Sequence, residues 1–388
     1  MNHEMKKIGL LVYGRFPTEK AYGSHVVDIA NGFIDNNFSV TIYFSRTNNK
    51  KTLNTPPQDY YRNTKINYVE VKNYDFTNNK FYEILPNFFK KILWNLGAYM
   101  WSKNLNSQIK LEDYIWSTNP NVLLRHSKSK TMLIYEKHGA GKYIQKYIVK
   151  KLSKFKNVIF VGTSKTSFNE LYKIAPERTI YLTNGVNVDE YKKEKQRDKS
   201  EKINIGYIGM LETYGKDKGV RKAFSELKKL STEYDFKLTL IGGPNEKIDE
   251  IVKDFQNIDV QLEYLYKIPK FEVPSYMKGL DIGIVPYPDD YHMSNYASPL
   301  KIFEYAASET IVLASNIKSN LELKDSGLGI EYFKHDDYED FNSKIRKLLE
   351  SEKIRNQHLE NSNNNIYSYS WKNRNEELIN FCVRSSIG

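Results

Sequence analysis

The chain has 388 residues, enough for two or three domains with separate hydrophobic cores. It is 40% hydrophobic and 27% charged, as in ordinary globular proteins, and no apolar run reaches the roughly 18 residues of a membrane-spanning helix. A net charge of +11 suits a phosphorylated substrate or an anionic membrane face. Zinc-finger spacing and RNA-binding aromatic signatures are absent, so nucleic acid is not an expected partner. The single cysteine, Cys382, excludes an intrachain disulfide and a multi-cysteine metal site.

The first half of the chain alternates strand-like and helical patterns. Its first apolar run is too short for a signal peptide and ends at a glycine, as a first β-strand would, so we expect a cytoplasmic protein. The alternation predicts parallel sheets covered by helices. Strand-like runs are Ile8–Tyr13, Val40–Phe44, Met132–Tyr135 and Val158–Val161, and helical patterns lie at 24–36, 142–154 and 165–174.

Residues 80–103 interrupt this alternation with a broad apolar stripe, which is accompanied by Trp94, Trp101 and four lysines. Basic amphipathic helices that are rich in aromatic residues lie at membrane surfaces. One hypothesis is therefore a peripheral contact with an anionic membrane. The alternative is a helical hairpin that packs on the first sheet and is broken at Pro86, because an apolar stripe at helical spacing is usually core.

The second half begins after a polar, charged segment, Tyr191–Lys202, which is typical of a linker. The alternation then resumes with strand-like runs at Ile203–Ile208, Lys237–Ile241, Asp281–Pro286 and Ile311–Ala314. We predict an α/β protein with two doubly wound parallel-sheet domains, residues 1–188 and 189–369. An amphipathic helix over 370–388 is expected to pack back on the first domain. Open α/β sheets bind ligands at the carboxyl ends of their strands, so a ligand cleft between the domains is expected.

Residues 296–316 are the most informative stretch. Ser298 and Pro299 predict the start of a helix, with the serine as a cap and the proline in the first turn. The first-turn N–H groups of such a helix suit an anion such as a phosphate. Glu304 lies two turns in, at the right depth to accept hydrogen bonds from a ribose. The alternative is a surface helix with an ordinary solvated glutamate.

Two glycine-containing segments in the second half also follow strands. Residues 206–219 predict a strand, a glycine-bearing loop and a helix that begins after Gly219. Glycines let a phosphate approach the backbone, and Lys216 or Lys218 can neutralise its charge. The run Leu238–Pro244 also ends in glycines, although both segments are equally compatible with structural turns. Neither is a P-loop or a dinucleotide fingerprint, which argues against a dehydrogenase.

The first domain offers two further candidates. Residues 14–25 form a strand-end loop that leads into a helix near Gly23, where an anion could meet the helix N-terminus. His138 follows the strand at 132–135 and could hydrogen-bond a sugar hydroxyl or assist proton transfer. The alternative for His138 is a purely structural role.

Seven motifs occur in a characteristic order: G-S-H near residue 24, Y-E-x-H at 135–138, N-G-V-N at 184–187, Y-I-G-x-L…K-G at 207–219, L-I-G-G at 240–243, D-I-G-I-V-P-Y at 281–287 and S-P-L-K-I-F-E-Y at 298–305. In this order the chain resembles the retaining GT-B glycosyltransferases of family 4, except over about residues 45–120. The resemblance implies two Rossmann-like domains, with the nucleotide-sugar held mainly by the second. It also implies a C-terminal helix that crosses back to the first domain.

The resemblance assigns roles in the second domain by position. Glu304 matches the glutamate that binds the ribose of the nucleotide. Leu300 and Lys301 match the helix start that meets the diphosphate, and Lys218 matches the lysine that stabilises the leaving phosphate. The remaining donor-binding positions that it implies are Gly209, Gly243 and Ser298.

In the first domain, Gly23 matches a glycine loop near the donor phosphates and the acceptor, and His138 matches a histidine beside the transferred sugar. Asn184 would lie near the hinge. Two positions depart from the common pattern: Tyr296 replaces a glutamate that faces the sugar, and Met210 replaces an arginine. Lys301, Lys216 or Arg15 could supply the missing positive charge.

The resemblance thus implies a retaining enzyme that uses a nucleoside-diphosphate sugar and needs no metal or other cofactor. Asp289 and Asp290 lie in a loop and need not coordinate an ion. The positive charge and residues 80–103 suggest an acceptor at the inner face of the plasma membrane, such as a lipid-linked glycan or a surface-polysaccharide precursor. The alternative is a soluble acceptor. The alternatives are a nucleotide-sugar epimerase of the same fold, and a catalytically silent subunit that partners another transferase.

Overall fold

The protein is described by a computed structural model over residues 5–18, 20–45, 55–73, 82, 84–141, 143–193, 202–213, 215–256 and 258–387. The chain divides into two compact units. The first comprises Met1–Thr183 together with Trp371–Gly388, and the second comprises Asn184–Ser370. The sequence placed the division after residue 188 and the start of the final helix at residue 370. Each unit is described by itself.

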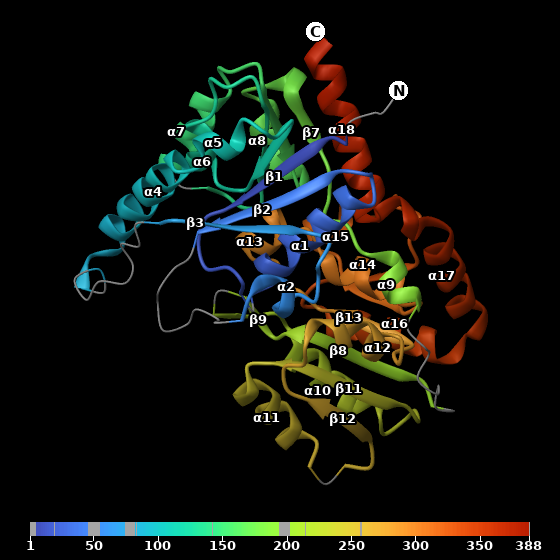
Figure 1. The fold of residues 1–388 in the computed structure, drawn as a ribbon. Helices are drawn as coiled ribbons and strands as arrows, with labels where there is room; N and C mark the ends of the chain where they lie inside the picture. The colour runs from blue at the N-terminus through green and yellow to red at the C-terminus, as the bar shows by residue number, and fades with distance from the viewer. Residues whose placement is uncertain are drawn as a thin grey trace. The chain divides into compact units, whose positions relative to one another are not determined.

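The first unit contains a seven-stranded sheet in the order β3-β2-β1-β4-β5-β6-β7, with parallel pairing throughout (Figure 1). This is the order of a doubly wound, Rossmann-like sheet. The four strands predicted for this half are confirmed as β1, β2, β5 and β6, whereas the three other strands, β3, β4 and β7, were not predicted. The bounds are β1 Lys7–Val12, β2 Ser39–Ser45, β3 Asn67–Val71, β4 Tyr114–Ser117, β5 Met132–Lys137, β6 Val158–Gly162 and β7 Thr179–Tyr181.

Helices surround this sheet, and the C-terminal helix α18 packs against α1. Their close approach requires a glycine, because a Cβ added to Gly32 would lie 2.6 Å from the carbonyl oxygen of Trp371. Asn375 Nδ2 donates to the Ile29 carbonyl at 2.8 Å and fixes the same contact. The helices are α1 Ala21–Ile34, α2 Pro57–Tyr60, α4 Asn87–Lys103, α5 Asn106–Ile109, α6 Pro120–Leu124, α7 Tyr143–Leu152, α8 Lys165–Tyr172, the 3₁₀ turn η2 Pro176–Arg178, and α18 Trp371–Ile387.

Helix α4 has one buried side and one exposed side. The break predicted at Pro86 is confirmed, because Pro86 is the N-cap residue of α4. The buried side joins the core, where Trp101 Nε1 donates to the Val71 carbonyl at 3.1 Å. Exposed apolar side chains form the other side, among them Phe88 and Phe89. Within the described ranges, no helix is both long and apolar enough to cross a membrane.

The second unit contains a six-stranded parallel sheet in the order β12-β11-β8-β13-β14-β15, again a Rossmann-like order, and a separate two-stranded hairpin of β9 and β10. The four strands predicted for this half are confirmed as β8, β11, β13 and β14. The bounds are β8 Asn204–Met210, β9 Glu212–Thr213, β10 Lys216–Asp217, β11 Lys237–Gly243, β12 Gln261–Leu265, β13 Ile282–Val285, β14 Ile311–Ser315 and β15 Ile330–Phe333.

The helices of the second unit are α9 Val188–Lys193, α10 Val220–Leu230, α11 Asn245–Asp254, η3 Lys270–Glu272, α12 Val273–Met277, α13 Tyr291–Tyr296, α14 Leu300–Ala307, α15 Lys318–Leu321, α16 Tyr338–Glu350, α17 Glu352–Asn365 and η4 Ile366–Tyr369. The start of the predicted linker is helical instead of extended: it belongs to α9, in which Tyr191 is buried. Residues 194–201 of that segment lie outside the described residues.

Packing fixes helix α14 tightly on the second sheet. Tyr305 of α14 is fully buried, and its hydroxyl accepts a hydrogen bond from the Ile208 backbone N–H at 3.0 Å. A Cβ added to Gly283 of β13 would lie 2.7 Å from the Tyr305 ring, so this glycine lets the ring rest on the strand. Helix α14 is thereby held beside the carboxyl end of β8.

Candidate functional site

The residues predicted to form a site fall into two groups, one in each unit. Gly23 and His138 belong to the first unit. The second unit holds the other predicted positions, which are Gly209, Lys218, Gly243, Ser298, Leu300, Lys301 and Glu304. Each group has its own geometry.

Helix α14 begins as the sequence predicted, but its cap differs. The N-cap residue is Pro299, and no side chain caps the helix. The Ser298 hydroxyl instead accepts from the Asn184 backbone N–H at 2.9 Å, while Asn184 Nδ2 donates to the Ser298 carbonyl at 3.3 Å. The prediction of Ser298 as a capping residue is therefore wrong. Its hydroxyl ties the start of α14 to the 184–187 segment, with Leu300 as the first helical residue.

Lys301 and Glu304 form an ion pair on α14, with 2.7 Å between Nζ and Oε2. The lysine stem lies against the end of β8, because a Cβ added to Gly209 would be 2.8 Å from Lys301 Cε. Gly209 also has a φ of +154°, a backbone conformation that side chains disfavour. The strand end, the lysine and the glutamate are thus brought together at the N-terminal half of α14.

Lys218 is positioned by the β9–β10 hairpin. Its backbone N–H donates to the Leu211 carbonyl at 2.9 Å, and Gly219 caps α10 with a φ of +81°. An alternative residue at 219 would collide, since a Cβ there would lie 2.2 Å from the Pro286 carbonyl oxygen. The Lys218 ammonium sits over the Tyr287 ring, 5.7 Å from its centroid. The predicted helix start after Gly219 is confirmed by α10.

Electrostatics link Lys218 to the ion pair on α14. The pKa of Lys218 is lowered to about 8, first by burial and then by the charge of Lys301, while Glu304 acts in the opposite direction. Two cations held close together in partly desolvated surroundings create a site that favours an anion. A bound phosphate would relieve the repulsion between the two lysines.

The other predicted positions around this group differ in their surroundings. Gly243 ends β11, and its carbonyl accepts from the Leu211 N–H at 2.8 Å, although a Cβ at Gly243 would meet nothing closer than Met210 Sδ at 3.7 Å. Met210 itself is 45% exposed. Tyr296 is buried, with its hydroxyl 3.4 Å from that of Tyr291, so it serves the packing of the second unit.

Three further polar residues were weighed from the sequence. Asp290 is the N-cap of α13 and accepts from two backbone N–H groups, and Asp289 accepts from the Ser294 hydroxyl. Lys216 is 64% exposed, with its Nζ 4.0 Å from Asp290. Of the candidate replacements for a missing cation, Lys301 acts on the pKa of Lys218, whereas Arg15 belongs to the first unit.

Gly23 lies inside the first turn of α1, not in the loop before it. A Cβ there would lie 2.2 Å from the Tyr61 hydroxyl and 2.7 Å from Thr18 Cγ2. Tyr61 in turn accepts from the Thr18 backbone N–H at 3.0 Å. This glycine therefore permits close packing between the helix start and the preceding loop.

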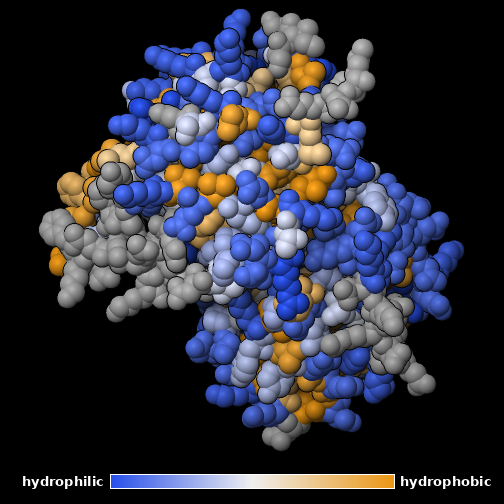
Figure 2. Space-filling view, in the orientation of Figure 1, coloured by the Kyte–Doolittle hydropathy of each residue, from blue (hydrophilic) through white to orange (hydrophobic). Residues whose placement is uncertain are grey.

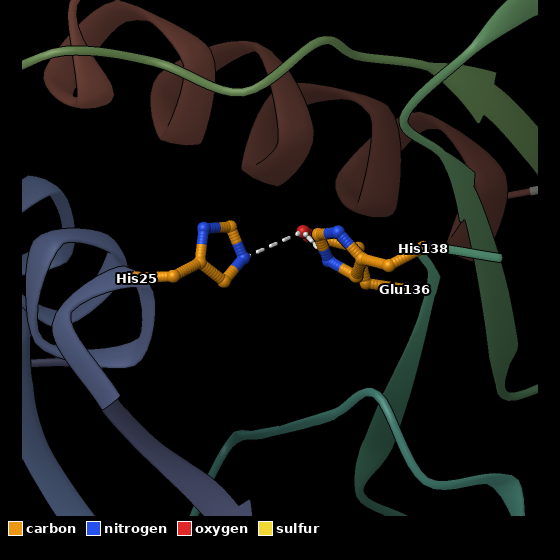
Figure 3. A group of neighbouring side chains, drawn as sticks. All are labelled: His25, Glu136 and His138. Carbon is orange, nitrogen blue, oxygen red and sulfur yellow. Dashed lines mark hydrogen bonds and ion pairs between the residues drawn. The ribbon is translucent and has the colours of Figure 1, made fainter. Parts of the chain in front are cut away.

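His138 belongs to a cluster that also contains His25 of α1 and Glu136 of β5 (Figure 3). His138 Nε2 lies 2.8 Å from Glu136 Oε1, and His25 Nε2 lies 3.5 Å from the same oxygen. The His25 and His138 rings meet edge to face, with centroids 4.7 Å apart. Glu136 is fully buried, whereas His138 is 31% exposed, so the histidine is the member that a ligand can reach.

The buried carboxylate is held by two other elements. Arg374 Nη2 of α18 donates to Glu136 Oε2 at 2.8 Å, and Trp116 Nε1 of β4 donates to the same atom at 3.0 Å. Burial alone would raise the pKa of Glu136, but Arg374, the hydrogen bond with His138 and the nearby His25 hold it well below its usual range. Burial lowers the pKa of His25 to about 4. The cluster therefore pairs an ionised carboxylate with an arginine and a neutral His25.

The same cluster was tested as a metal site. Its three ligand atoms lie within 4.8 Å of one another, the only such group in the part of the chain that the structure describes. Both carboxylate oxygens are already engaged, however: Oε2 by Arg374 and Trp116, and Oε1 by His138. A divalent ion would have to compete with the guanidinium of Arg374. The donor set fits a charge-paired hydrogen-bond network better than a cation site.

Sequence reasoning selected His138 but missed Glu136, His25 and Arg374. Glu136 could have been predicted from His138, because the two residues are two positions apart and alternate residues of a strand point to the same face. His25 lay inside the quoted G-S-H motif. Nothing in the local sequence could pair Arg374 with Glu136, since they are 238 positions apart.

Comparisons with known proteins show which sequences and structures this chain is similar to. Residues 188–365 match the family model "Glycosyl transferases group 1". A protein of Bacillus subtilis (strain 168), described as "Putative teichuronic acid biosynthesis glycosyltransferase TuaH", is 29% identical over 189 residues, or 45% of this chain. That match spans 43% of the length of the relative.

Two solved structures are similar over nearly the whole chain. HepE of Anabaena in complex with UDP and glucose matches with a TM-score of 0.65 and 12% identity, over 97% of this chain and 99% of its own. A glycosyltransferase from Rickettsia africae ESF-5 matches with a TM-score of 0.70 and 15% identity, over 97% of this chain and 98% of its own. At this identity the structures establish the fold. The resemblance found in the sequence motifs is confirmed: the chain has the GT-B fold, and its residues 188–365 match the family model of the glycosyl transferases group 1.

Proposed function

We propose that the protein is a retaining glycosyltransferase that uses a nucleoside-diphosphate sugar. The observation that carries this proposal is the group of Lys218, Lys301 and Glu304 at the carboxyl end of β8. Burial and the charge of Lys301 together lower the pKa of Lys218, so a diphosphate is the ligand that would stabilise both lysines. Glu304, one turn farther along α14 than Lys301, would accept hydrogen bonds from the ribose hydroxyls.

The relatives support a nucleotide donor. HepE of Anabaena was solved with UDP and glucose, and its fold covers nearly all of this chain. The family match covers the unit that holds the two lysines and Glu304. The donor would therefore bind mainly to the second unit, with its diphosphate near Gly209.

The transfer step would break the bond between the anomeric carbon and the diphosphate oxygen. The acceptor hydroxyl oxygen would form the new bond on the same face of the sugar, and its proton would pass to the departing phosphate oxygen. Lys218 and Lys301 would stabilise the charge that develops on the diphosphate, as preorganised cations do. No strong carboxylate base is required by this route.

We also propose that no divalent metal takes part. The two lysines can neutralise the leaving group, and Asp289 and Asp290 are engaged with Ser294 and with the first turn of α13. Transfer should therefore persist in EDTA. A requirement for added Mg²⁺ or Mn²⁺ would contradict this part of the proposal.

The acceptor is proposed to be a lipid-linked glycan or a surface-polysaccharide precursor. Its membrane setting is suggested by α4, where Phe88 is 63% exposed, Phe89 51% and Leu96 46%. Figure 2 shows hydrophobic residues on the outer surface over α4. Lys91 and Lys103 are exposed on the same helix. Helix α4 therefore combines apolar side chains that could insert into a membrane with positive charges that attract anionic lipid.

Membrane binding can be tested with sedimented vesicles. Wild-type protein should bind phosphatidylglycerol vesicles more tightly than phosphatidylcholine vesicles, and Phe88→Ser/Phe89→Ser should lose most of that binding. Phe271→Ser is a matched control, because Phe271 is 44% exposed in the second unit. Equal sedimentation of all three proteins would contradict a role for α4.

The activity itself is tested by incubating the protein with a panel of nucleoside-diphosphate sugars and membrane-extracted glycolipids, in EDTA. The expected product is a glycosylated lipid with the donor's anomeric configuration, seen by NMR. An inverted product would exclude the retaining mechanism. Turnover of the donor without any acceptor, giving an epimer of the donor sugar, would favour an epimerase. Absence of turnover with intact nucleotide binding would favour a silent subunit.

A further inference from the structure

We propose that Glu136 is a positioning residue: anchored by Arg374 and Trp116, it holds His138 in the tautomer with the proton on Nε2, so that Nδ1 presents a lone pair to a sugar hydroxyl. The catalytic meaning of this inference rests on the proposed transferase function. The tautomer itself rests only on the contacts of the first unit.

The ionised carboxylate of Glu136 fixes the position of the proton that it shares with His138. An ionised carboxylate can only accept hydrogen bonds, and Glu136 Oε1 lies 2.8 Å from His138 Nε2. The shared proton must therefore be on the imidazole nitrogen. In neutral histidine the other nitrogen, Nδ1, then carries a lone pair and acts as an acceptor. A carboxylate partner of this kind fixes both the tautomer and the orientation of a histidine ring.

Glu136 stays ionised because two donors satisfy its second oxygen. Arg374 Nη2 lies 2.8 Å from Oε2 and Trp116 Nε1 lies 3.0 Å from it. Arg374 is itself fixed, since its Nε donates to the Thr183 carbonyl at 2.6 Å and its guanidinium lies 5.2 Å from the Trp371 ring centroid. The C-terminal helix α18 thereby reaches the face of the first sheet where His138 lies.

His25 does not replace His138 as the main donor. Its Nε2 is farther from Oε1, at 3.5 Å, and among the described residues it has no partner with hydrogen-bond geometry. Its ring instead packs edge to face on His138 and on Trp371, with centroids 4.7 and 5.3 Å away. The groups that act on the pKa of His25 are Glu136 on β5, His138 and Arg374 on α18, so the four side chains share one electrostatic environment.

The ligand expected at Nδ1 is a hydroxyl group that donates a hydrogen bond. His138 is the exposed member of the cluster, so it is the one that can meet such a hydroxyl. The hydroxyl could belong to the transferred sugar or to the acceptor, which share this chemistry. Hydrolysis of the donor by water distinguishes these two possibilities, because it involves the hydroxyl of the transferred sugar but not that of the acceptor.

The first test is the wild-type protein. Long-range ¹⁵N–¹H NMR of ¹⁵N-histidine-labelled protein distinguishes the two tautomers, and the His138 signals are assigned by comparison with His138→Asn. We expect the proton on Nε2 at neutral pH. A proton on Nδ1, or a rapid mixture of the two tautomers, would overturn the proposal, whether or not transferase activity is found.

The second test separates positioning from folding. Glu136→Gln should give a tautomer mixture at His138 and lower kcat by about tenfold to hundredfold, with the Kd of the nucleotide unchanged. Glu136→Gln/Arg374→Met removes both charges and guards against the loss of folding that one unpaired buried charge can cause. Arg178→Met is a matched control: Arg178 donates to the Ser153, Phe155 and Val158 carbonyls of the same unit, so its loss should leave the His138 signals unchanged.

The outcomes keep the two proposals apart. An unchanged tautomer and unchanged kcat in Glu136→Gln would overturn the positioning role. A locked Nε2–H tautomer in a protein that transfers no sugar would support the positioning geometry and contradict the proposed function alone.

Discussion

Lys301 Nζ lies 2.7 Å from Glu304 Oε2, so the two side chains expected to bind opposite ends of a nucleotide are already paired on α14. Both are about one-fifth exposed, at 19% and 18%. Such a pair adds up to about 1 kcal/mol to stability. The ion pair would contribute more by preorganising the nucleotide site, since it holds the Lys301 ammonium near Gly209 and the Glu304 carboxylate one turn farther along α14.

Glu304→Gln should weaken nucleotide binding by about tenfold to hundredfold, because a charge-assisted hydrogen bond to the ribose is worth about 1.5–3 kcal/mol. The melting temperature should change little. Calorimetry on the single variants and on Lys301→Met/Glu304→Gln measures the coupling directly. Strict additivity of the two losses would show that the ion pair does not preorganise the site.

Lys218 should give nucleotide binding a distinctive pH dependence. The pKa of Lys218 is lowered to about 8, first by burial and then by Lys301, so the ammonium form is lost as pH rises through 8. A diphosphate binds the charged form, and affinity should therefore fall by up to about tenfold per pH unit above pH 8. Lys218→Arg keeps the charge and should abolish this fall. A flat profile in the wild-type protein would contradict contact between Lys218 and the diphosphate.

Gly209→Ala should disturb both the strand end and Lys301. The residue has a φ of +154°, and the new Cβ would lie 2.8 Å from Lys301 Cε. The expected cost is about 1–3 kcal/mol of unfolding free energy, together with weaker nucleotide binding. Gly243→Ala is the control for stability, since its Cβ would meet nothing closer than 3.7 Å. Chemical denaturation should rank Gly209→Ala well below both the control and the wild-type protein.

His25 should make the first unit sensitive to acid. Burial lowers its pKa to about 4 in the folded protein, against about 6.5 in an unfolded chain. The unfolded state then binds more protons between these values, so stability is full above pH 6.5 and declines as pH falls toward 4. The loss is at most about 3 kcal/mol.

His25→Gln should flatten that decline. His126 has its pKa lowered to about 4 as well, so His25→Gln/His126→Gln should flatten it further. Urea denaturation at pH 7, 6 and 5 measures the effect. An identical decline in the wild-type protein and the double variant would show that carboxylates alone govern the acid response.

The sequence was most informative where side-chain periodicity and chain order act together. Each strand predicted from an apolar run was found, because buried parallel strands are continuously apolar. The strands that were not predicted are short or half-exposed. In β12, for example, Gln261, Glu263 and Tyr264 are exposed, which hides the apolar signal.

The site was predicted less completely, for a physical reason. Lys218, Lys301 and Glu304 lie in motifs whose local spacing already predicts a strand end and a helix start. The cluster of Glu136, His25 and Arg374 depends on contacts between α1, β5 and α18, which no local pattern encodes. Ser298 was wrongly predicted for a different reason. A serine before a proline is typical of a helix cap, but here the Ser298 hydroxyl accepts a hydrogen bond from the Asn184 backbone N–H instead.

The most direct test of the proposed donor site is calorimetric titration of UDP, GDP, ADP and dTDP into the wild-type protein and Glu304→Ala, with EDTA present. We expect that one nucleotide binds the wild-type protein and that the variant loses this binding while keeping its melting temperature. Failure of every nucleotide to bind the wild-type protein, or equal binding by Glu304→Ala, would contradict the proposed donor site.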